Sequence, residues 1–294
     1  MNGSYQPGWQ PRRAPRALGY LGSVARRPTV PLLVALVSLL AMALTGVLGL
    51  ASPGAHERDA AMLHGFVALD RPRVHDAIYV LAHLADPVPY LAVGAALVGW
   101  ALLRGLRRRA GFVAALLVLT GASTQALKHL LAQPRFESWL GLHQIGAASW
   151  PSGHSTAAMT LALCAVLVAP AALAPVVAVL GGAFAAAVGY AVLVLAWHFP
   201  SDVLGGFLMA GTWTALAVAA LRVVEPLRER RSRERRLGLA LGVGVGAALA
   251  AAVVVAAPRD EVALYAAERP TLVLGAVVIA ALAGALSAGL ARAA

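Results

Sequence analysis

Long apolar stretches, separated by short polar or proline- and glycine-containing segments, dominate the pattern of this chain. A helix that crosses about 30 Å of hydrocarbon needs about 20 consecutive, mostly apolar residues. By this measure the chain offers eight membrane spans, at 29–51, 80–103, 111–131, 154–170, 175–197, 203–222, 237–257 and 271–291. Asp86 and Pro87 interrupt the start of the second span. The pattern predicts an all-α, polytopic transmembrane helix bundle, with residues 52–79 as an outer loop lying along the membrane interface.

The composition excludes an ordinary soluble globular protein. Hydrophobic residues make up 60% of the chain and charged residues 13%, with a mean hydropathy of +0.76. The charged share is about half that of a typical soluble domain. The single cysteine, Cys164, lies within an apolar stretch, which excludes both a disulfide framework and a thiolate metal cluster.

The distribution of charge predicts the orientation of the chain. Cytoplasmic loops carry an excess of Lys and Arg, and a cytoplasmic N-terminus places 17 of the 24 basic residues inside. All eight histidines then fall on the outer side or at outer helix ends. We therefore expect a multi-pass cell-membrane protein with both termini in the cytoplasm and its chemistry at the outer face. The net charge of +11 reflects topology, so we expect no nucleic-acid partner, although 226–236 could also bind anionic lipid headgroups.

Three polar clusters lie at the outer ends of the predicted spans, at 128–135, 151–154 and 198–202. The fourth span runs inward and the fifth returns outward. His154 begins the fourth span and His198 ends the fifth, so both imidazoles should reach the same membrane surface.

The first two clusters offer groups that bind an anion. Lys128 is the only lysine in the chain, and such a position can require a compact ammonium. Arg135 follows a Gln-Pro pair that should end the helix, although both cations could also merely extend to the interface. Ser152 and Gly153 begin a helix, where free backbone N–H groups cradle anions. The alternative for Ser152 is a simple helix cap.

The third cluster offers a nucleophile. Pro200 favours the first turn of a new helix, which places Asp202 in that turn. A carboxylate there can accept the N–H of one nitrogen of His198 and leave the other nitrogen free to attack. The alternative is a helix-capping aspartate beside an interfacial histidine.

Together these groups suit phosphoryl transfer, which needs donors for the phosphate oxygens, an in-line nucleophile and an acid for the leaving oxygen. The histidine pairs His56/His64 and His75/His83 are each eight residues apart, too far for a pair of helical metal ligands. We therefore expect chemistry without a metal or other cofactor.

The three clusters resemble the signature of the type 2 phosphatidic acid phosphatase superfamily, integral-membrane lipid phosphatases related to vanadium haloperoxidases. That signature is Lys followed seven residues later by Arg-Pro, then Pro-Ser-Gly-His, then Ser-Arg, five residues, His, three residues and Asp. The resemblance implies a six-helix core with an outer site, and a phosphohistidine on His198 oriented by Asp202. It also implies that His154 protonates the leaving group. The implied phosphate-binding residues are Lys128, Arg135, Ser152 and Gly153.

The chain departs from this signature at several positions. Phe136 replaces the proline after Arg135, and Gln133 stands where many members carry arginine. The Ser-Arg pair is replaced by Ala191 and Val192, so one phosphate-binding arginine is missing. The loss of one transition-state donor typically costs about 3–4 kcal/mol, or roughly 10²–10³ in rate.

The sequence therefore predicts a metal-independent lipid phosphate or diphosphate phosphatase at the outer membrane face. Its partners are the bilayer and a lipid phosphate, either a polyprenyl diphosphate or a phosphatidate-type lipid, and its oligomeric state is left open. The alternative is a weakened or inactive lipid-headgroup binder of the same fold, whereas the absence of internal repeats argues against a transporter. The expected regions are a disordered tail (1–28), the phosphatase core (29–222), an Arg-rich loop (223–236) and two added spans (237–294).

Overall fold

A computed structural model describes residues 28–225, 239, 241–246 and 259–293. All the regular structure of these residues is helical, which confirms the predicted all-α class. The predicted tail up to residue 27, the Arg-rich loop from residue 226 and most of the predicted span 237–257 lie outside the described residues. The division of the chain into a core and two added spans stays a prediction.

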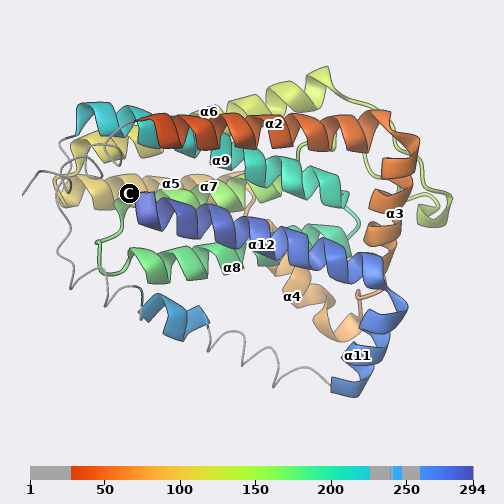
Figure 1. Ribbon diagram of the computed structural model, residues 1–294. Coiled ribbons are helices and arrows are strands. Elements are labelled where there is room, and N and C mark those ends of the chain that lie inside the picture. The colour runs from red at the N-terminus through yellow and green to blue at the C-terminus, as the bar shows by residue number, and fades with distance from the viewer. Residues whose placement is uncertain (1–27, 226–238, 240, 247–258, 294) are drawn as a thin grey trace, which may run out of the picture.

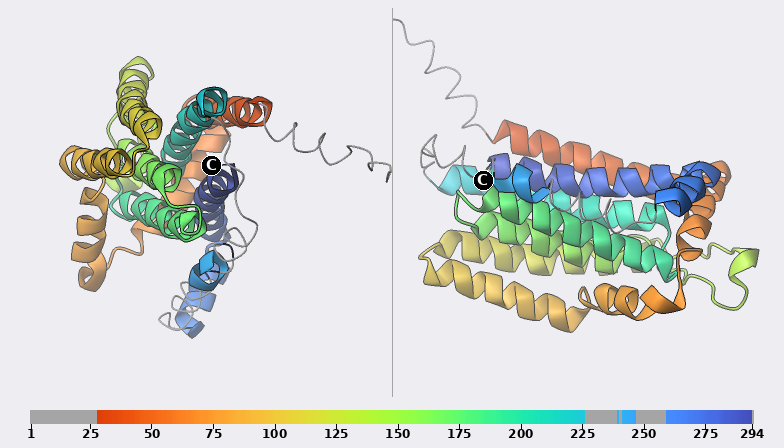
Figure 2. Two further views of the ribbon diagram at one scale, coloured as in Figure 1. Left: turned by 90° about the vertical axis from the view of Figure 1, so that its left-hand side faces the viewer. Right: turned by 90° about the horizontal axis from the view of Figure 1, so that it is seen from below.

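The long helices lie side by side in a bundle (Figure 1), and the view along the bundle in Figure 2 shows them end-on. Two short helices, α3 and α11, lie at the end of the bundle where α2 ends and α12 begins. The helices are α2 (Thr29–Ala51), α3 (Pro53–Val67), α4 (Pro72–His83), α5 (Pro87–Leu103), α6 (Arg107–Leu130), α7 (Gly153–Val168), α8 (Ala174–Val194), α9 (Pro200–Val224), α11 (Arg259–Glu268) and α12 (Pro270–Ala293), with a 3₁₀ turn at Ser138–Leu140.

Five of the described helices, α2, α6, α8, α9 and α12, are long and apolar enough to cross a membrane. The α4–α5 pair would provide a sixth crossing if it acts as one span, and α7 is an apolar helix of only 16 residues. These helices match seven of the eight predicted spans in position. The chain is therefore a multi-pass membrane protein.

The prediction of a continuous second span at 80–103 is wrong. Two helices, α4 and α5, meet there at an angle of 54°. Pro87 occupies the first turn of α5, where its missing N–H needs no partner. The break leaves Asp86 at the corner between the two helices.

The segment predicted as an outer loop, 52–79, contains α3 and much of α4. Leu63 and Phe66 of α3 are fully buried, and they share one helix face with Asp59. The segment therefore packs against the protein and brings an acidic side chain inward.

The turns that begin α7 and α9 are held directly together. The backbone N–H of Ser152 donates to the carbonyl oxygen of Asp202 at 2.9 Å. A Cβ added at Gly206 of α9 would lie 2.7 Å from the carbonyl oxygen of Ser152, so only glycine permits this approach. The close packing fixes the positions of His154 and His198, which flank these two turns.

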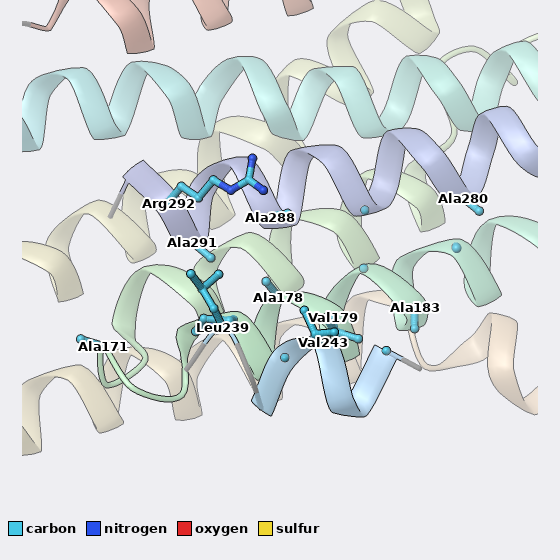
Figure 3. A pocket seen from close by; sticks show the side chains of 16 residues that line it. Ala171, Ala178, Val179, Ala183, Leu239, Val243, Ala280, Ala288, Ala291 and Arg292 are labelled. Carbon is cyan, nitrogen blue, oxygen red and sulfur yellow. The ribbon is translucent and has the colours of Figure 1, made fainter. Parts of the chain in front are cut away.

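An apolar cavity of about 680 Å³ lies between α8, α12 and the helical residues 241–246 (Figure 3). Small residues such as Ala178, Gly182 and Gly284 make up much of its wall. Arg292 is the only titratable side chain among the described residues that line it. This cavity therefore lacks the groups needed for acid–base or nucleophilic chemistry.

Candidate active site

The histidines of the second and third sequence clusters lie close together. The ring centroids of His154 and His198 are 6.2 Å apart. His154 lies in the first turn of α7, and His198 lies between α8 and α9. The antiparallel course of α7 and α8 thus returns both side chains to one end of the bundle, as the order of the spans predicts.

His198 is buried beside Asp202. Its Nδ1 lies 3.4 Å from Oδ2 of Asp202, which also accepts the backbone N–H of Phe199 at 2.9 Å. Burial lowers the pKa of His198; Asp202 opposes this effect, whereas Lys128 and Arg135 add to it. His198 is therefore neutral at pH 7, with a lone pair on one ring nitrogen.

A cavity of about 460 Å³ reaches this histidine pair between α5, α6 and α7. Lys128, Gly153, His154 and His198 all line it. A Cβ added at Gly153 would lie 3.9 Å from Nζ of Lys128, so the ammonium lies close to the backbone that begins α7. This corner of the cavity combines a cation with the N-terminus of a helix, an arrangement that favours an anion.

Ser152 lies behind this corner and is not among the cavity-lining residues. Its side chain is fully buried, and its Oγ accepts the backbone N–H of Ser155 at 3.3 Å. The structure thus places Ser152 as the cap of α7, the alternative reading of its sequence position.

Arg135 also lies outside the cavity lining, in contrast to its expected contact with phosphate. Its buried guanidinium donates through Nη2 to Oδ1 of Asp202 at 2.5 Å and to Oγ of Ser149 at 2.6 Å. The guanidinium carbon lies 4.0 Å from the centroid of the Phe199 ring, and Nη1 lies 3.7 Å from a carboxylate oxygen of Asp59. In this state Arg135 compensates the charge of two carboxylates.

Asp59 of α3 is one of two acidic neighbours that the sequence motifs do not include. Its carboxylate accepts the backbone N–H of Ser201 at 2.9 Å and the Ser201 hydroxyl at 2.5 Å. Burial raises the pKa of Asp59 to about 6; the Ser201 hydroxyl opposes the shift and Asp202 adds to it. The sequence signal was an acidic residue on the same helix face as Leu63 and Phe66.

Asp86 is the second acidic neighbour, and it lines the cavity. Its Oδ1 lies 3.0 Å from Nε2 of His154, and its Oδ2 lies 3.9 Å from Nε2 of His83. In the sequence this aspartate marks the interruption before Pro87, a position that only the observed helix break brings to the site.

Val192, which occupies the position of the arginine in the family signature, is fully buried in the apolar core. Among the described residues that line the cavity, Lys128 is the only lysine or arginine. Within the described part of the chain, no group of three or more His, Cys, Asp or Glu side chains is arranged to hold a metal ion. Metal independence stays a prediction.

Comparison with known proteins adds a family match over part of the chain. Residues 109–225 match the family model described as the PAP2 superfamily. A solved chain, described as the first transmembrane PAP2 type phosphatidylglycerolphosphate phosphatase from Bacillus subtilis, is 20% identical. The likeness covers 66% of this chain and 98% of that chain, with a TM-score of 0.49. The search of curated proteins gives no match.

The segment matched by the family model runs from the first turns of α6 to the end of α9. It contains all three sequence clusters, whereas Asp59 and Asp86 precede it. The resemblance predicted from the sequence is thereby confirmed as a match of residues 109–225, the part of the chain that carries these clusters, to the PAP2 superfamily model.

Proposed function

We propose that this protein is a lipid phosphatase that transfers a phosphoryl group through His198. The observation that supports it best is the placement of His198, His154 and Lys128 on the wall of one cavity, with the two imidazole rings 6.2 Å apart. A buried, neutral imidazole beside a carboxylate is a suitable nucleophile, and a second imidazole across the cavity can serve as acid and base.

In the first step, Nε2 of His198 attacks phosphorus while Nδ1 keeps its proton toward Asp202. A nitrogen–phosphorus bond forms and the bond between phosphorus and the ester oxygen breaks. The departing oxygen takes the electron pair of that bond and a proton from protonated His154, and it leaves as an alcohol or, from a diphosphate, as a lipid monophosphate. Lys128 and the N–H groups that begin α7 stabilise the charge on the phosphoryl oxygens.

In the second step, water attacks phosphorus and gives a proton to the now neutral His154. The nitrogen–phosphorus bond breaks and its electron pair returns to Nε2 of His198. Inorganic phosphate leaves, and both histidines regain their starting protonation states. Each proton and electron pair is accounted for by groups on the cavity wall.

A lipid substrate is supported by the shape and lining of the cavity. From Lys128 and His198 it extends along α5 and α6 past Leu91 and Leu117, which are apolar. The arginines Arg104 and Arg107 lie at the opposite ends of these helices, and such clusters mark the cytoplasmic side. We therefore place the site at the outer face, where a phosphatidate-type lipid or a polyprenyl diphosphate fits the chemistry.

Phosphate release from short-chain lipid phosphates by purified protein tests this function. We expect turnover with the wild type, none above background with His198→Ala, and no loss on treatment with a chelator. Equal release at background from wild type and His198→Ala, across a panel that includes both lipid classes, would contradict it.

That negative result would favour the second candidate, a lipid-headgroup binder without turnover. The apolar, buried Val192 in place of the motif arginine is the observation that favours it. Binding of a lipid phosphate, measured by its effect on thermal unfolding, would then persist without phosphate release.

A further inference from the structure

We propose that Asp86 is a positioning residue for His154 and, through it, for protonation of the leaving oxygen. The inference rests on the proposed function and adds to the catalytic groups a residue from outside the matched segment 109–225. It follows from a contact between two side chains on the cavity wall, from the bend that creates this contact, and from the partial exposure of the pair.

The contact forms a second His–Asp pair opposite the first. Oδ1 of Asp86 lies 3.0 Å from Nε2 of His154, and both residues line the same cavity as His198. The His198–Asp202 pair is formed through Nδ1, whereas His154 is held through Nε2. The two imidazoles therefore present opposite nitrogens to their carboxylates.

The contact determines which nitrogen of His154 can work on the substrate. A carboxylate beside Nε2 favours the tautomer that carries its proton there. Nδ1 is then the nitrogen that gives a proton to the leaving oxygen and later takes one from water. Burial and the nearby His198 disfavour the imidazolium form that must exist before the first step, and the hydrogen bond and charge of Asp86 oppose this effect.

The bend between α4 and α5 explains how Asp86 reaches His154. The two helices meet at 54°, and Asp86 directly precedes the first turn of α5. Around the pair, His83 lies 3.9 Å from the other oxygen of Asp86, and the Trp197 ring centroid is 5.4 Å from that of His154. These neighbours limit the orientations open to the His154 ring.

The pair is exposed enough to argue against a purely structural role. The side chains of His154 and Asp86 are 25% and 34% exposed. Ion pairs that are partly open to solvent contribute little to stability, about 0–1 kcal/mol. A substitution at Asp86 should therefore change catalysis without unfolding the protein.

Two substrates that differ only in their need for a proton test the proposal. An alkyl lipid phosphate such as dioctanoyl phosphatidate releases a basic alkoxide, whereas p-nitrophenyl phosphate releases a stable phenolate that needs no acid. General acid–base catalysis contributes roughly 10²–10⁴-fold. We expect Asp86→Asn to lower kcat for the alkyl substrate by about 10- to 100-fold as part of that contribution, and to change the aryl rate by much less. Asp86→Glu should restore part of the alkyl rate.

The matched control is Asp70→Asn, because Asp70 forms an exposed His–Asp pair with His75 at 3.0 Å and does not line the cavity. It should change neither rate. In a His154→Gln background, Asp86→Asn should cause no further loss, since the residue it positions is already gone.

The inference would be overturned by equal losses on both substrates, by no loss on either, or by additive losses in the double variant. If Asp86→Asn does not fold, the Asp86→Glu and His154→Gln proteins still allow the alkyl and aryl substrates to be compared. The inference would then be overturned if neither protein loses activity selectively on the alkyl substrate. A wild-type protein inactive on both substrates would overturn the proposed function and this inference with it. Selective loss on the alkyl substrate supports both.

Discussion

Nη2 of Arg135 donates to Oδ1 of Asp202 at 2.5 Å, and both side chains are buried. Asp202 in turn lies 3.4 Å from His198. The guanidinium of Arg135 does not line the cavity. Its charge therefore acts on His198 indirectly, through the carboxylate of Asp202 that orients the imidazole.

This relationship predicts a large loss of stability in Arg135→Leu. Removing one partner of a buried ion pair leaves the other charge uncompensated, at a cost of about 3–5 kcal/mol. The thermal unfolding midpoint in detergent should fall strongly, and phosphate release should fall with it. Arg71→Leu, at an exposed arginine, should leave the midpoint unchanged. An unchanged midpoint in Arg135→Leu would show that the pair does not hold the site together.

Asp59 predicts a pH dependence of stability. Its pKa is raised from 3.8 to about 6, so folding favours the protonated carboxyl. The stabilisation associated with the proton is fully present below pH 3.8 and is lost as the pH rises toward about 6. Asp59→Asn cannot ionise, so the stability of the wild type relative to this variant should decline over that range and stay level above it. A pH-independent difference in unfolding free energy would contradict the burial of an ionisable Asp59.

The lowered pKa of His198 predicts the acid limb of the activity profile. Only the neutral imidazole can attack phosphorus, and burial moves its titration below 6.5. The acid limb of kcat/KM should therefore lie below pH 6.5. In Lys128→Gln the limb should move to higher pH, because Lys128 contributes to the lowering. Because both proteins are compared on one substrate, the titration of the substrate itself affects them equally. An acid limb that stays in place or moves to lower pH in Lys128→Gln would contradict the assignment of this limb to His198.

Gly206 predicts a steric effect on the site. A Cβ there would lie 2.7 Å from the carbonyl oxygen of Ser152 and 2.9 Å from the backbone nitrogen of Thr156, and neither atom can move independently. Gly206→Ala should separate the turn of α7 from α9, at about 1–3 kcal/mol of stability. Misplacing His154 by about 1 Å can lower turnover by roughly 10². Gly111→Ala, with no atom within 4 Å of the new Cβ, is the matched control. Normal turnover in Gly206→Ala would contradict the tight packing of these turns.

The lengths of the apolar stretches and the placement of charge were sufficient to predict the bundle and the shared end of His154 and His198. An apolar stretch long enough to cross the membrane has few alternatives to a helix. Because successive spans cross the membrane in opposite directions, their order determines which helix ends lie on the same side. The sequence predicted His198 beside Asp202 because Pro200 favours the start of a new helix, which places Asp202 in its first turn, close to the residue that ends the preceding span.

The remaining features depend on which helices are neighbours, and neither the length of an apolar stretch nor the placement of charge carries that information. Asp59 reaches Ser201 because α3 folds inward across the end of the bundle, and Asp86 reaches His154 because α4 and α5 meet at a bend. Ser152 and Arg135 carry the expected residue types and form hydrogen bonds with Ser155 and Asp202, which the sequence does not reveal; their roles in binding phosphate stay predictions. A motif specifies residue types, whereas tertiary contacts decide which side chains are free.

Direct detection of the covalent intermediate tests the central proposal most sharply. Purified protein would be mixed with a ³²P-labelled lipid phosphate, quenched at alkaline pH on the timescale of one turnover, and digested for mass spectrometry. The account predicts label on a peptide that contains His198, stable to base, labile to acid and absent from His198→Ala. Turnover without any labelled peptide, or with label on another residue that persists in His198→Ala, would contradict it.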